Sequence, residues 1–165
     1  MERLTVRKAG TRLATLLLVS LALASCTNTP KPENDLTNNG RNSPATPGSA
    51  RDFAVNVGDI VYFSTDQVEL TPEAQQTLAG QARWLQQYSQ YTITIEGHAD
   101  ERGSDSYNED LAERRAARVR DMLLEAGVAR ERLSVSSYGE SQPLNAGHDE
   151  EAWSTNRRVE IKILK

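Results

Sequence analysis

The stretch GHADERGSDSYNEDLAERRA, residues 97–116, separates a strand pattern from a helix pattern and decides how the fold is assembled. Before it, residues 92–96 (TITIE) alternate between apolar and polar side chains, which predicts a β-strand. After it, a helical pattern runs from about residue 106 to residue 126 and ends at Gly127, a residue suited to a helix C-terminus. We therefore expect a charged loop between a strand and a long helix.

Arg115 lies on the face of this helix where aliphatic residues are expected. It falls inside an apolar arc that is formed, at 100° per residue, by Leu111, Val119, Met122, Leu123 and Ala126. A buried guanidinium needs acceptors, and Asp100 and Glu101 in the preceding loop are within reach of a long side chain. Two interpretations follow. Asp100 and Arg115 form an internal salt bridge, or they grip a ligand that carries both an ammonium and a carboxylate.

The chain around this stretch provides the remaining elements of one domain. A first helix is predicted from Thr71, as N-cap, with Pro72 in the first position, to about Gln90. Further strands are predicted at residues 59–64 (DIVYFS), 133–138 (LSVSSY) and 159–164 (VEIKIL). The order β-α-β-α-β-β predicts an α/β (α+β) fold, with one sheet and helices on one of its faces.

The amino end has the features of an export signal. A basic start precedes an apolar run at residues 13–24 (LATLLLVSLALA), which is too short to span a bilayer as a helix. The run closes on LASC, whose Cys26 is the only cysteine of the chain. We expect residues 1–25 to be a lipoprotein signal peptide and Cys26 to be lipidated, because the motif resembles a bacterial lipobox. The alternative is an ordinary signal peptide with Cys26 as a stray thiol.

A segment of different composition follows the cysteine. Residues 27–50 are rich in proline, asparagine, serine and threonine, and Leu36 is their single large aliphatic residue. Such a segment cannot bury enough apolar surface to offset its ordering entropy. We therefore expect residues 26–50 to be a lipidated cysteine with a disordered tether, and residues 51–165 to be the folded domain.

The charge balance argues against nucleic acid as a partner. The chain has 19 basic and 23 acidic residues, and loss of the basic signal peptide would increase the acidic excess. Phosphate backbones require a basic footprint, which this composition does not offer.

Catalysis and metal binding have weak support in the sequence. His98, Asp100 and Ser104 are neighbours, whereas a catalytic triad converges from separate elements, and no nucleophile elbow surrounds Ser104. The chain has two histidines, His98 and His148, and no second cysteine, so a transition-metal site would depend on carboxylates. We expect no enzymatic activity, no cofactor and no metal.

Several motifs together resemble the OmpA-like peptidoglycan-binding domain over residues 58–164. In the family's order they are VYF, EGHADERGSDSYNEDLAERRAARV, SYGESQPL, GHDEEAW and NRRVEI. The resemblance implies a two-layer sandwich with a mixed four-stranded sheet. It also implies noncovalent binding of the peptide stem of peptidoglycan through meso-diaminopimelate, whose free end carries both charges.

The resemblance implies a set of binding residues. The family's aspartate and arginine match Asp100 and Arg115. Neighbouring contact positions match Arg102, Asn108, Phe63, Asp66 and Ala99. Many relatives carry an aspartate where this chain has Ser64, so that contact is in question, although Asp66 could face the same cleft.

With the lipobox and tether in front, the chain resembles lipoprotein members of this family. The resemblance implies an outer-membrane lipoprotein that faces the periplasm and tethers that membrane to peptidoglycan. It further implies binding to TolB and the Tol complex, with a role in outer-membrane invagination during cell division. The alternatives are a wall-binding lipoprotein outside the Tol system and a periplasmic hydrolase that uses His98, Asp100 and Ser104.

Overall fold

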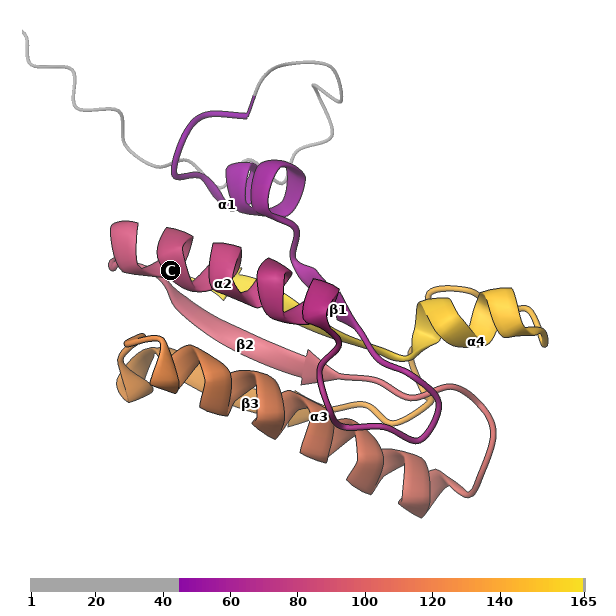
Figure 1. Cartoon of the computed structure of the whole chain (residues 1–165). Helices are drawn as coiled ribbons and strands as arrows, with labels where there is room; N and C mark the ends of the chain where they lie inside the picture. The colour runs from indigo at the N-terminus through magenta and orange to yellow at the C-terminus, as the bar shows by residue number, and fades with distance from the viewer. Residues whose placement is uncertain (1–44, 165) are drawn as a thin grey trace, which may run out of the picture. The chain divides into compact units, whose positions relative to one another are not determined.

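The computed structural model describes residues 45–164, in which four strands form one mixed sheet (Figure 1). The strands follow the spatial order β1-β4-β2-β3, and their bounds are β1 Ile60–Tyr62, β2 Thr92–Gly97, β3 Leu133–Ser137 and β4 Arg158–Leu164. Strands β2 and β3 are parallel, whereas β4 is antiparallel to both β1 and β2. The predicted α/β sandwich with a mixed four-stranded sheet is confirmed.

Two long helices cover one face of the sheet, and several short helices connect the strands. The long helices are α2 (Pro72–Gln87) and α3 (Asp105–Glu125). The short ones are α1 (Ala50–Asp52), η1 (Phe53–Val57), η2 (Arg130–Arg132) and α4 (Glu150–Asn156). These short helices were not predicted from the sequence, because two turns or fewer are too short for an apolar stripe to repeat.

Side-chain caps fix where the two long helices begin. The Thr71 hydroxyl accepts a hydrogen bond from the Ala74 amide at 3.2 Å, and Pro72 occupies the first helical turn. The Ser104 hydroxyl accepts one from the Tyr107 amide, also at 3.2 Å. These bonds satisfy amides that otherwise have no partner within the helix. The loop after β2 therefore ends at a defined residue, Ser104.

The hydrophobic core lies between the helices and the sheet. From the sheet it contains Ile93 and Ile95 of β2 and Val159 and Ile161 of β4, all almost completely buried. The helices contribute the apolar residues Ala74, Leu78, Ala82, Trp84, Leu85, Ala116, Val119 and Leu123. Strands β2 and β4 are the two central strands, and both long helices lie on this one face of them (Figure 1).

The described chain begins before the predicted domain boundary at residue 51. The Tyr91 hydroxyl donates to the Gly48 carbonyl at 2.8 Å, and Gly48 packs under the Tyr88 ring. Cys26, the signal peptide and most of the predicted tether lie outside the described residues. Within residues 45–164, no helix combines the length and the apolar character needed to cross a membrane.

Gly97 allows α3 to approach the end of β2. A Cβ atom at this position would lie 2.0 Å from the Ala112 carbonyl oxygen and 3.2 Å from the Ala116 Cβ. The first contact is with helix backbone, which cannot rotate away as a side chain could. Only glycine therefore fits the sheet at this helix crossing.

We predict that Gly97→Ala destabilises the domain by at least about 3 kcal/mol, because strand and helix must separate to admit the methyl group. The matched control is Gly80→Ala in α2, where the nearest atom to an added Cβ is 3.8 Å away. That change should stabilise the helix by roughly 0.5–1 kcal/mol. Urea unfolding of both variants measures the difference, and equal effects would contradict the assigned crossing.

Candidate functional site

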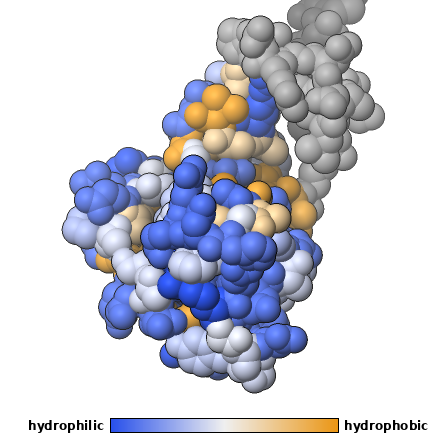
Figure 2. All heavy atoms as spheres, turned by 90° about the vertical axis from the view of Figure 1, so that its right-hand side faces the viewer, coloured by the Kyte–Doolittle hydropathy of each residue, from blue (hydrophilic) through white to orange (hydrophobic). Residues whose placement is uncertain are grey.

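Four segments of the chain meet beyond the C-terminal end of β2. They are the β1–α2 loop, the β2–α3 loop, the loop after β3 and helix α4, which lie at the same end of the domain in Figure 1. Figure 2 views the molecule from that side and shows a mainly hydrophilic surface. The sheet topology thus gathers polar loops that are far apart in the sequence.

Arg115 lies at the centre of this region and is completely buried. Its guanidinium donates three hydrogen bonds to backbone carbonyls: Nε to Gln67 at 2.9 Å, Nη1 to His98 at 3.1 Å and Nη2 to Ser64 at 3.0 Å. Its Cζ also lies 5.2 Å from the centroid of the Phe63 ring. Arg115 therefore fastens the β1–α2 loop to the end of β2.

The charge of Arg115 has no carboxylate partner within hydrogen-bond distance among the described residues. Burial, together with the nearby Arg157 cation, lowers the pKa of Arg115 to about 10, so the side chain stays cationic at neutral pH. Three carbonyl dipoles solvate this charge without neutralising it. Asp100 and Asp66 act on this charge only through space and partly offset the lowering of its pKa.

Asp100 takes its hydrogen bonds from other arginines. Its Oδ1 accepts from the Arg102 amide at 3.1 Å and from Arg102 Nε at 3.0 Å. Its Oδ2 accepts from Arg102 Nη2 at 2.8 Å and from Arg157 Nη1 at 3.2 Å. The proposed internal salt bridge between Asp100 and Arg115 is therefore wrong: the ion-pair partners of Asp100 are Arg102 and Arg157.

These four donors fill the acceptor capacity of one carboxylate. Burial alone would raise the pKa of Asp100, but the hydrogen bonds from Arg102 and Arg157 outweigh that effect and lower it below the ordinary value of 3.8. Asp100 is therefore ionised in the free protein at neutral pH.

Helix α4 contributes residues to the site that were not predicted from the sequence. Arg157, at its C-terminal end, donates to Asp100, to the Phe63 carbonyl at 3.1 Å and to Glu150 Oε1 at 2.5 Å. The indole Nε1 of Trp153 donates to Glu101 Oε1 at 2.9 Å, and Arg102 Cζ lies 4.2 Å from the Trp153 ring centroid. Arg157 and Trp153 thus hold the charged β2–α3 loop through its residues Asp100 and Glu101.

The remaining predicted residues surround these charges in different ways. Phe63 and Ala99 are buried, and the Ala99 amide donates to the Gly139 carbonyl at 2.8 Å. Asn108 is buried and its amide group donates to Glu140. Asp66 has a positive φ of 54° and accepts from the Tyr107 hydroxyl at 3.4 Å. The structure therefore brings all seven predicted residues to one end of the domain.

The geometry gives no support to a catalytic triad. Ser104 caps α3, Asp100 is occupied by arginines, and both ring nitrogens of His98 lack a hydrogen-bond partner. No hydrogen bond joins any two of these three side chains in the described part of the chain. The nucleophile–base contact on which the hydrolase alternative depends is not formed.

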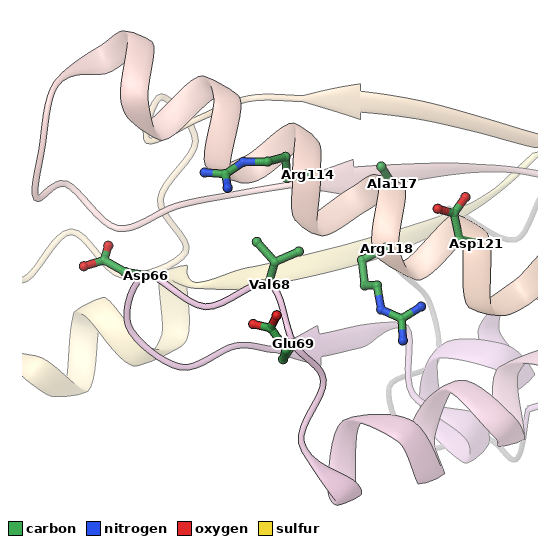
Figure 3. A pocket seen from close by; sticks show the side chains of 7 residues that line it. All are labelled: Asp66, Val68, Glu69, Arg114, Ala117, Arg118 and Asp121. Carbon is green, nitrogen blue, oxygen red and sulfur yellow. The ribbon is translucent and has the colours of Figure 1, made fainter.

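Two cavities flank the site. One, of about 400 Å³, lies between the β1–α2 loop and α3 and is lined by Asp66, Val68, Glu69, Arg114, Ala117, Arg118 and Asp121 (Figure 3). Figure 3 shows both acidic and basic side chains around it. The other, of about 280 Å³, includes Ala99, Glu101, Glu140 and His148 in its lining. Neither is lined by the Arg115 side chain, which the β1–α2 loop covers.

Comparison with known proteins places this geometry in a family. The peptidoglycan-associated lipoprotein of Mesorhizobium japonicum is 51% identical over 145 residues, which cover 87% of this chain and 86% of that protein. The protein of the same name from Brucella melitensis is 46% identical over 152 residues, covering 92% and 90%.

Solved structures agree with the fold described above. The peptidoglycan-associated lipoprotein from Burkholderia pseudomallei superimposes with a TM-score of 0.66 at 31% identity, covering 70% of this chain and 100% of that chain. The C-terminal domain of Helicobacter pylori MotB superimposes with a TM-score of 0.61 at 27% identity, covering 65% and 84%. The model of the OmpA family matches residues 62–157, more than half of the chain and all four site segments, so the chain belongs to the OmpA family.

Proposed function

We propose that this chain is an outer-membrane lipoprotein that binds the peptide stem of peptidoglycan noncovalently and so tethers the outer membrane to the cell wall. The relatives named peptidoglycan-associated lipoprotein support this proposal, at up to 51% identity over most of the chain. The observation that carries it is the arrangement of Asp100 and Arg115. An acid and a cation that are not bonded to each other, at one end of the domain, suit a ligand that carries both charges.

Asp100 receives the ammonium group of meso-diaminopimelate. Because its carboxylate is already saturated, one donor has to leave before a ligand binds. The side chain of Arg102 is 38% exposed and that of Arg157 is 6% exposed, so Arg102 is the replaceable donor. After this exchange Arg102 can remain on the Trp153 ring, beside the ligand.

Arg115 receives the ligand carboxylate. Its guanidinium has five N–H donors, and three of them bind carbonyls, which leaves two. The side chain is completely buried, so the carboxylate reaches it only when the Ser64 and Gln67 carbonyls move aside. A carboxylate can replace them favourably, because it neutralises the charge that carbonyl dipoles only solvate.

We predict that Asp100→Ala and Arg115→Lys each weaken binding to purified peptidoglycan at least roughly tenfold. Removing one partner of a desolvated charge pair costs about 2–5 kcal/mol, and a lysine cannot reproduce the planar fork of arginine. Free meso-diaminopimelate should compete with peptidoglycan for the wild type. Sedimentation with insoluble peptidoglycan measures binding.

Matched controls separate binding from folding. Glu125→Ala and Arg83→Lys change exposed residues outside the four site segments and should leave affinity unchanged. Melting temperatures are measured on the same preparations, because Arg115 also holds the β1–α2 loop. If the folded fractions of both site variants bind peptidoglycan normally, Asp100 and Arg115 serve structure and not the ligand.

Anchoring at Cys26 is the second part of the proposal. A single acyl chain gives only marginal membrane attachment, whereas several chains on one residue make it stable. We predict that Cys26→Ser moves the chain out of the outer-membrane fraction, while Ser25→Ala, which keeps the thiol, leaves it there. Fractionation of cells and immunoblotting measure this, and membrane retention of the Cys26 variant would contradict the anchor.

Binding to TolB and the Tol complex, with a role in division, is the third part, and it rests on similarity to the lipoprotein relatives. We propose that TolB binds a surface overlapping the Asp100 and Arg115 region. Two ligands that share a surface lower each other's apparent affinity, so saturating peptidoglycan peptide should weaken the TolB interaction. If TolB does not bind this chain at all, a wall-binding lipoprotein outside the Tol system is favoured instead.

A further inference from the structure

His98 is a buried histidine whose polar atoms have no partner. Its side chain is 1% exposed, and neither Nδ1 nor Nε2 makes a hydrogen bond. The ring lies against Tyr138, with centroids 5.4 Å apart and an angle of 18° between the planes, so its orientation is fixed by stacking. Buried nitrogens without partners are rare in native proteins and indicate a missing ligand, ion or water.

Two carboxylates lie beside this ring, on the face of the sheet opposite the long helices. Glu96 on β2 and Glu160 on β4 are directly paired in the antiparallel register. His98 follows Glu96 by two residues, which returns its side chain to the same face. One oxygen of each carboxylate and one nitrogen of His98 all lie within 4.8 Å of one another.

We propose that Glu96, His98 and Glu160 form a binding site for a divalent transition-metal ion, with Zn²⁺ as the representative ion. One imidazole and two carboxylates are a donor set that zinc accepts, and three protein ligands leave a position for water. Two carboxylates also balance the charge of a dication. The site is distinct from the Asp100 and Arg115 region, because the His98 side chain lies on the other face of the sheet.

Two cations stand next to the proposed site and limit its affinity. The ammonium of Lys162 is ion-paired with Glu160 and has to leave when a metal binds. Its side chain is 45% exposed, so it can move into solvent. The guanidinium of Arg158 is buried and lies 3.8 Å from Glu160, where it remains as a repulsive charge. We therefore expect an exchangeable site and not a structural one.

Metal binding requires a modest contraction of the cluster. Tetrahedral zinc with ligands at about 2.0 Å places them about 3.3 Å apart, whereas in the free protein the three ligand atoms are known only to lie within 4.8 Å of one another. Both glutamates are only partly buried and have flexible side chains, whereas His98 is held by Tyr138. The carboxylates can thus close on a fixed imidazole.

The test uses the full chain in detergent, without a histidine tag and with Cys26→Ser in every sample, because a free thiol would itself bind zinc. Isothermal titration with Zn²⁺ should give one ion per chain. Glu96→Gln and Glu160→Gln should each weaken binding at least about tenfold, since even an outer-shell partner of a metal contributes that much. Lys162→Met should strengthen it by removing the competing ammonium.

A control variant and a spectroscopic measurement decide the location. His148→Ala removes the only other histidine, which is exposed and paired with Glu101, and should leave zinc binding unchanged. The ¹⁵N resonances of the His98 ring should shift on zinc addition. The proposal is overturned if zinc binding is not saturable, if Glu160→Gln has no effect, or if His148→Ala abolishes binding. A water bridging His98 and Arg158 would produce the first of these results.

Discussion

The hydrogen bonds of Arg115 to three backbone carbonyls hold together the end of the domain at which the β1–α2 and β2–α3 loops meet. Two of the carbonyls, from Ser64 and Gln67, belong to the β1–α2 loop, and the third belongs to His98 at the end of β2. Burial of a guanidinium without acceptors would be prohibitive, so the loop can close over α3 only in the conformation that supplies them. The position of the loop and the burial of Arg115 therefore depend on each other.

Charge in the rest of the site is arranged around this cation. Asp100 lies near Arg115 but is satisfied by Arg102 and by Arg157, which itself bonds to Glu150 on α4. The negative and positive groups are thus kept apart from each other, while each is held by other partners. Such an arrangement prevents collapse of Asp100 and Arg115 into an internal ion pair.

Sequence patterns predicted the elements of this fold better than the contacts of its site. The period of two in residues 92–96, the cap at Thr71 and the apolar stripes of the helices are local signals, so strands and long helices could be identified. The apolar arc of α3 also indicated correctly that Arg115 is buried. Its acceptors could not be predicted, because they are backbone carbonyls, which carry no sequence signature, from residues up to 51 positions away.

Two other features were missed for related reasons. Arg157 follows a helix of seven residues, too short to be recognised, so its place beside Asp100 appears only in the folded chain. The pairing of Glu96 with Glu160 depends on the register of β2 against β4, which a shift of one residue would abolish.

Gly97 and His98 connect the two faces of the sheet. Because side chains alternate along a strand, Gly97 faces α3 and admits the helix that carries Arg115. The His98 carbonyl accepts a hydrogen bond from that arginine, while the His98 ring lies on the opposite face beside Glu96 and Glu160. These two adjacent residues therefore contribute to both faces of the sheet.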